Sequence, residues 1–119
     1  MELDWSKGPL AEGLRLYEAA EFFAAHEVWE EVWLAAPEPE KTFLQGLIQV
    51  TAAFYHMQRN NSLGTELLLQ AALGRLQRYP ESFGGLAVHS LCGEIRDRLR
   101  ILEAREEGIK LLPARIVPL

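Results

Sequence analysis

Apolar residues in this chain recur at the three- and four-residue spacing of an α-helix, and no segment shows the strict alternation of a half-buried strand. The clearest example is a stripe near the end of the chain, formed by Val88, Leu91, Cys92, Ile95, Leu99 and Leu102. No Asn-Gly or Asp-Gly pair marks a tight hairpin between two apolar runs. The sequence therefore predicts an all-α protein.

Proline, glycine and asparagine divide this pattern into the segments of a multihelical bundle. The predicted helices cover residues 9–19, 22–35, 39–60, 63–78 and 88–107, and residues 82–85 are expected to form a loop. The first two segments are either separate helices or one kinked helix, so the bundle has four or five helices. The segment 39–60 is apolar over most of its circumference, which predicts that it is the central helix.

The end of the chain breaks the helical pattern. From about residue 109 it is an apolar tail, and Pro113 and Pro118 prevent that tail from being helical throughout. Such a tail packs over its own bundle or docks on a second subunit, and in either case we expect it to be ordered. With 119 residues there is room for one hydrophobic core, so residues 1–119 are expected to form a single domain.

The composition favours a cytoplasmic protein. No run of about 18 uncharged apolar residues could cross a membrane, and the acidic start MELDWSKG lacks the apolar region of a signal peptide. The single cysteine, Cys92, cannot form an internal disulfide, which fits a reducing cytosol. Its place on the apolar stripe predicts a buried core residue rather than a nucleophile.

The charge distribution argues against a nucleic-acid partner. Residues 1–40 carry ten acidic and two basic residues, whereas residues 41–119 carry seven acidic and ten basic residues. The arginines of the last predicted helix alternate with acidic residues, so they read as a solvated face and not as a phosphate-binding surface. The uneven distribution could instead help one molecule dock on another.

The second predicted helix places a histidine beside aromatic residues. On a helical wheel Phe22, His26, Trp29 and Trp33 lie within about 60° of one another, which predicts that His26 is in the middle of an aromatic face. Glu30 lies one turn after His26, within reach of its side chain. Glu27 and Glu31 are expected to point to solvent.

A polar stripe interrupts the apolar surface of the central helix. It consists of Gln45, Gln49, His56 and Asn60, and alanines stand between these residues. The stripe either faces water or forms a semi-buried seam, since exposed helix faces usually carry more charge. If this helix folds back on the preceding one, His26, Glu30, Gln49 and His56 could converge.

These segments resemble a small helical family of bacteria and archaea, the domain of unknown function, family 309. The resemblance rests on HEVWEEVW, which fits an HxxxExxW pattern at His26, Glu30 and Trp33, followed by FLQGLIQVTAAFYHMQRNN and NNSLGTELLLQAAL. It spans residues 16–76 and implies a metal-associated site at the three motif residues, with no assigned reaction. One departure lies near Ala20, where the family pattern implies a glycine before the Phe-Phe pair.

Three interpretations of this region stay open. His26, Glu30 and His56 could hold a divalent metal ion such as zinc, iron or manganese with an open position for substrate, although neither HExxH nor a Glu-x-x-His pair is present. Glu30 and His26 could act as acid–base catalysts without a metal. Alternatively, they could form a satisfied buried pair that fixes the packing of the helices.

The resulting functional hypothesis is a binding or interaction module. Its ligand is a small molecule, a peptide or a second subunit of a homo-oligomer. The expected ligand-binding residues are Trp29, Trp33, Gln45, Gln49 and Asn60. The alternative is a metal-dependent, hydrolytic enzyme that uses His26, Glu30 and His56; no sequence feature names a substrate.

Overall fold

The computed structural model describes residues 1–105 and 110–119. Within these residues the chain forms five helices and one very short hairpin. The helices are α1 (Gly8–Glu18), α2 (Phe22–Ala35), α3 (Glu40–Gln58), α4 (Ser62–Leu76) and α5 (Val88–Glu103). The predicted all-α fold class is confirmed, and each predicted helix is present with ends that differ by no more than four residues.

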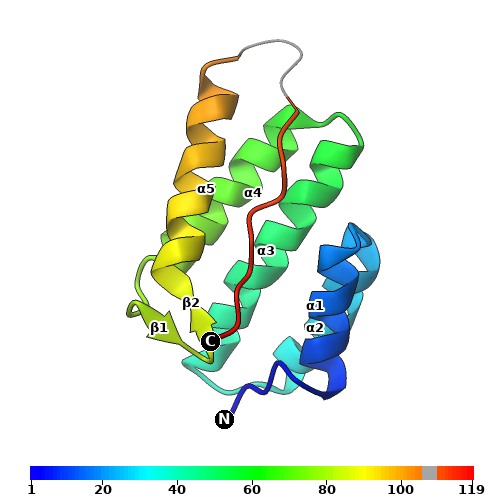
Figure 1. Ribbon diagram of the computed structural model, residues 1–119, viewed down its shortest axis with the longest axis vertical. Helices are drawn as coiled ribbons and strands as arrows, with labels where there is room; N and C mark the ends of the chain where they lie inside the picture. The colour runs from blue at the N-terminus through cyan, green and yellow to red at the C-terminus, as the bar shows by residue number, and fades with distance from the viewer. Residues whose placement is uncertain (106–109) are drawn as a thin grey trace.

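Consecutive helices pack against one another, and α3 lies at the centre. It contacts α2 on one side and α4 on the other, while α1 packs on α2 and α5 packs on α4 (Figure 1). Its buried residues extend over almost its whole length, from Phe43 to Phe54. The prediction that this segment is the central helix is therefore confirmed.

The junction between α1 and α2 shows that they are separate helices. Ala20 lies between them with a φ of 61°, a left-handed conformation that ends the helical path. The two helices then pack closely: a Cβ atom at Gly13 would overlap the Trp29 indole, and the Trp29 Nε1–H donates to the Leu10 carbonyl at 3.2 Å. Glycine is thus required on the α1 side of this contact.

The start of α4 follows from a side-chain cap. The Oδ1 atom of Asn61 accepts a hydrogen bond from the Gly64 N–H at 3.0 Å, as the Asn-Asn-Ser sequence predicts. The buried Thr65 hydroxyl donates to the carbonyl of Ala53 at 3.1 Å and so ties α4 to α3.

Residues 82–87 form a two-stranded antiparallel hairpin where a plain loop was predicted. Strand β1 (Ser82–Phe83) pairs with β2 (Leu86–Ala87), and the turn between them is Gly84-Gly85, with φ values of 57° and 79°. The expectation of no strand was wrong to this extent, because two-residue strands are too short to show alternation in the sequence. The hairpin leaves the all-α class unchanged.

Helix α5 ends at Glu103, four residues before the predicted end at Glu107. Residues 106 and 107 of the predicted helix and the first tail residue, Ile109, lie outside the described residues. The predicted stripe is buried from Val88 to Leu99, and Cys92 is 1% exposed. Burial also raises the pKa of the Cys92 thiol, as expected for a core residue. No helix in the described ranges is both long and apolar enough to cross a bilayer.

Residues 110–119 run as an extended strap across α3, between the α1–α2 pair and the α4–α5 pair (Figure 1). Its buried side chains are Leu111, Ala114 and Ile116. The strap lies over its own bundle, which is the first of the two arrangements that the sequence left open.

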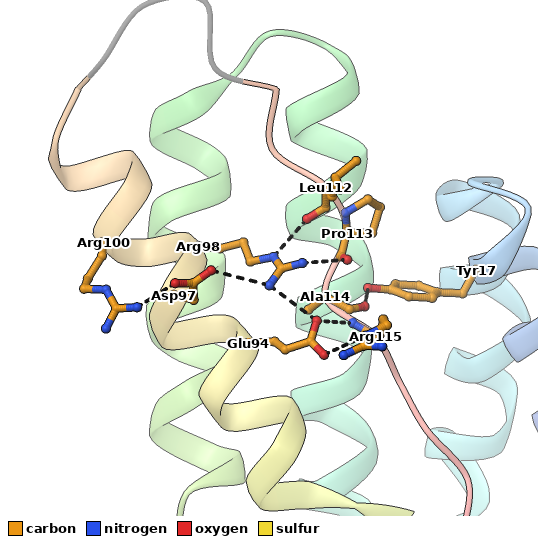
Figure 2. A network of polar contacts seen from close by, with 9 residues as sticks. All are labelled: Tyr17, Glu94, Asp97, Arg98, Arg100, Leu112, Pro113, Ala114 and Arg115. Atoms are coloured by element: carbon orange, nitrogen blue, oxygen red, sulfur yellow. Dashed lines mark hydrogen bonds and ion pairs between the residues drawn. The ribbon is translucent and has the colours of Figure 1, made fainter.

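Main-chain atoms of the strap are held by side chains of α1 and α5 (Figure 2). Arg98 donates to the carbonyls of Leu112 and Pro113 at 3.0 and 3.2 Å. The buried Tyr17 hydroxyl donates to the Ala114 carbonyl at 2.5 Å. The strap therefore links two helix pairs that are otherwise joined through α3.

Candidate functional site

His26 and Glu30 form the predicted contact on α2. The His26 Nε2 and Glu30 Oε2 atoms are 3.3 Å apart, and the two side chains are 32% and 47% exposed. However, the prediction that His26 lies in the middle of the aromatic face was wrong. The face that enters the core is formed by Phe22, Ala25 and Trp29. Its centre is rotated away from His26, so the imidazole lies at the edge of the face.

This edge of α2 forms a recess with α3. The recess has a volume of about 180 Å³ and is lined by Phe23, His26, Ala52, Tyr55 and His56. The Phe23 ring lies 6.0 Å from the His26 ring and 5.5 Å from the Tyr55 ring, measured between centroids. The two helices therefore bring His26 and His56 to one recess, whereas Glu30 and Gln49, which the convergence hypothesis also included, are not among its lining residues.

The orientation of His56 is fixed by the cap of α4. Asn61 uses its Oδ1 atom to accept from Gly64, so its Nδ2 amide is the group that faces His56 Nδ1 at 3.1 Å. An amide N–H can only donate, so His56 Nδ1 accepts. The neutral imidazole then carries its proton on Nε2, which has no hydrogen-bond partner among the described residues.

Two polar atoms of α2 are buried without a partner in the described part of the chain: His26 Nδ1 and Trp33 Nε1. Such atoms are rare in native proteins, and both belong to the HxxxExxW pattern. Trp33 does not donate to Glu30. Its ring instead lies under the ammonium group of Lys41, 4.3 Å from the ring centroid. Among the described residues, the buried side-chain polar atoms without a hydrogen-bond partner therefore lie on this helix.

The other expected ligand-binding residues lie elsewhere. Trp29 is fully buried, and its indole N–H is already bonded to Leu10, so it offers no surface to a ligand. Gln49 accepts from Arg75 of α4 at 3.4 Å and is not part of the recess.

The two ends of the polar stripe on α3 also lie outside the recess. Gln45 is half-buried, whereas Asn60 is exposed and borders a different cleft, beside Ala20. The stripe is thus a semi-buried seam from Gln45 to His56, as one interpretation proposed, but Asn60 is not part of it.

The arrangement does not fit a divalent metal ion. The described residues contain no group of three or more His, Cys, Asp or Glu side chains placed to hold one. A metal on His56 Nε2 would move the ring proton to Nδ1, where it would oppose the Asn61 amide. The metal hypothesis for His26, Glu30 and His56 therefore gains no support from the geometry, and neither does an enzyme that depends on it.

Sequence reasoning missed three residues that line the recess: Phe23, Ala52 and Tyr55. A signal for Phe23 was present, because it stands on the same side of α2 as the glutamates that were expected to face solvent. Exposed apolar residues mark contact surfaces when they are grouped, and the Phe23 ring lies next to the Tyr55 ring in the recess.

Comparison with known proteins adds a family but no activity. A family model described as "Domain of unknown function (DUF309)" matches residues 10–68, which include both walls of the recess. The uncharacterized protein YpuF of Bacillus subtilis (strain 168) is 31% identical over 65 residues, which cover 54% of this chain and 37% of YpuF. An uncharacterized protein of Aquifex aeolicus (strain VF5) is 31% identical over 101 residues, or 83% of this chain and 29% of that protein.

This chain therefore spans about a third of the length of the curated relatives that it matches. Through residues 10–68, it belongs to the family of the domain of unknown function DUF309.

Proposed function

We propose that this protein is a binding module whose recess between α2 and α3 receives a single side chain of a protein partner. The observation that carries the proposal is the combination of the recess with Phe23, a phenylalanine in its wall that is 53% exposed. A few aromatic or basic side chains that become buried in pockets contribute most of the energy of many protein–protein complexes.

The size of the recess favours a side chain over a free small molecule. Pockets for small molecules and cofactors usually enclose about 300–1,000 Å³. The recess has a volume of about 180 Å³, which suits one aromatic or branched aliphatic side chain. His56 adds an imidazole, a polar hydrogen-bonding group, to the lining of the recess.

The lengths of the relatives support a binding domain that occurs together with other segments in one chain. In YpuF and the Aquifex protein the matched region is 37% and 29% of the chain, so the remaining parts are available for other tasks. We place the interaction in the cytoplasm, because the one cysteine is buried and takes part in no disulfide.

Photo-crosslinking at the recess tests this proposal. The light-activated analogue p-benzoylphenylalanine would replace Phe23 in cells, and Leu112 of the strap, which is 60% exposed, would be the control position. We expect a discrete adduct from position 23 and none from position 112. Ala52→Leu, which fills the recess, should abolish the adduct. Equal adducts from both positions, or an adduct that persists after Ala52→Leu, would overturn the proposal.

A further inference from the structure

The outer face of α2 carries negative charge next to the recess. The fourteen residues of this helix include Glu27, Glu30 and Glu31 but no Lys or Arg. At 100° per residue these glutamates share an arc of about 100° with Phe23 and Leu34. Phe23 and Leu34 are 53% and 67% exposed. The face thus has an exposed apolar residue at each end and carboxylates between them.

These carboxylates are not neutralised by the chain itself. No Lys or Arg side chain in the described residues lies within 4.0 Å of them, and Glu30 contacts only the imidazole of His26. On other helices Glu12 pairs with Arg15 and Asp97 with Arg100, each at 2.5 Å, whereas Glu18 of α1 has no ion pair among the described residues. What distinguishes α2 is that its three carboxylates share one face of a helix that lines the recess and that this helix carries no Lys or Arg.

Arg59, at the recess, and Lys41, beside Trp33, are engaged with aromatic rings. Arg59 lies 5.6 Å from the centroid of the Tyr55 ring, at the recess. Lys41 lies over Trp33 and donates to the Trp33 carbonyl at 3.0 Å. Neither forms an ion pair with a glutamate of α2, so both leave the negative face open to a partner.

We infer that the partner is a basic amphipathic helix that lies along α2, with one apolar side chain in the recess and its lysines or arginines over Glu27, Glu30 and Glu31. This inference rests on the proposed binding function of the recess. Phe23 and Leu34 are eleven residues apart, which on a helix is about 17 Å. A partner helix of three turns spans that length and presents apolar residues and cations on one side.

Charge complementarity selects this class of partner. Carboxylates next to an apolar recess attract a cationic protein segment and repel nucleic acid and acidic peptides. Because these carboxylates are exposed, their attraction is screened by salt, whereas the contact in the recess is not. The complex should therefore weaken as the salt concentration rises.

Two synthetic probes test the inference on the full chain. They are fluorescein-labelled 18-residue amphipathic peptides with the same Leu/Trp face, one with lysines and one with glutamates on the polar face. Binding would be followed by fluorescence anisotropy at low and high salt. We expect the lysine peptide to bind and the glutamate peptide not to bind. The double variant Glu27→Gln/Glu31→Gln should weaken the lysine peptide at least tenfold.

A matched control separates local from overall charge. Glu18→Gln/Glu81→Gln removes the same number of charges from exposed residues outside α2 and should leave the Kd within twofold. Equal weakening by both double variants, equal binding of both peptides, or no binding of the lysine peptide would each overturn the inference. Crosslinking from position 23 to a second copy of this chain would overturn it as well.

These failures differ from a failure of the proposed function. If position 23 still gives a discrete adduct that Ala52→Leu abolishes, the recess binds a partner whose class is different. If that adduct is absent, the proposed function itself fails. Circular dichroism of each variant would show that its helical content is unchanged.

Discussion

Replacing His26 by alanine distinguishes a residue kept for binding from one kept for the fold. If His26 and Glu30 formed a buried pair, loss of the imidazole would strand a carboxylate inside the protein and lower the free energy of unfolding by about 3–5 kcal/mol. In the structure the two side chains are 32% and 47% exposed, so water continues to solvate Glu30 after the substitution. We therefore expect a much smaller effect.

The contributions can be estimated separately. A partly exposed contact between polar side chains at i, i+4 contributes at most about 0.3–0.5 kcal/mol. The buried part of the ring contributes roughly 1 kcal/mol of packing. Alanine regains about 0.5 kcal/mol through its higher helix propensity, and the substitution also removes the unpartnered Nδ1 atom. The net loss for His26→Ala should be below about 1 kcal/mol.

Urea denaturation followed by tryptophan fluorescence and by circular dichroism would measure this difference. The control is Trp29→Phe on the same helix, which shrinks a fully buried side chain and removes its bond to Leu10, and so should cost clearly more. A loss of 3 kcal/mol or more for His26→Ala would refute the reasoning and assign the residue to the fold.

Four further outcomes can be checked. Tyr17→Phe should lower the free energy of unfolding by about 1–3 kcal/mol, because the Ala114 carbonyl loses its buried donor. Burial raises the pKa of Tyr17, so the phenol ionises first in the unfolded chain and the parent protein should lose stability above a pH of about 10. The variant should lose less stability in the same pH titration. Ala20→Gly should raise the melting temperature by relieving about 1 kcal/mol of strain at φ 61°, while Ala24→Gly, inside α2, should lower it. Gly13→Ala should lower the melting temperature sharply, because the added methyl group would overlap Trp29. Gly93 has open space around it, so Gly93→Ala should raise the melting temperature. Similar shifts for the two variants would contradict the close packing of α1 on α2. Calorimetric titration with zinc should show no stoichiometric binding, and one ion per chain that is lost in His26→Ala/His56→Ala would contradict the geometry.

Local sequence signals were enough for the helices and for the contacts within them. The spacing of His26 and Glu30 predicted a real contact, and Asn61 predicted a real cap. The expected glycine near Ala20 also has a physical meaning, because that position adopts the left-handed conformation in which glycine is unstrained. Each of these signals depends on residues that are close together in the sequence.

The set of residues that lines the recess could not be predicted from such local signals. A helical wheel shows which residues share a face, but the direction of that face depends on how α1, α2 and α3 pack. Gly13 lets α1 approach the Trp29 side of α2, which turns the core face toward Ala25 and leaves His26 at its edge. Gln49 likewise found its partner on α4, at Arg75, and not on α2.

The position of the strap depends largely on contacts to its main chain, so it can be retained when exposed side chains of the strap change. Arg98 and Tyr17 donate hydrogen bonds to main-chain carbonyl oxygens, which every amino acid supplies. Substitutions at exposed positions such as Leu112 and Val117 would leave these hydrogen bonds intact, provided that the buried residue at position 114 stays small. Two related proteins could therefore differ at the exposed positions of this segment and still hold it by the same hydrogen bonds.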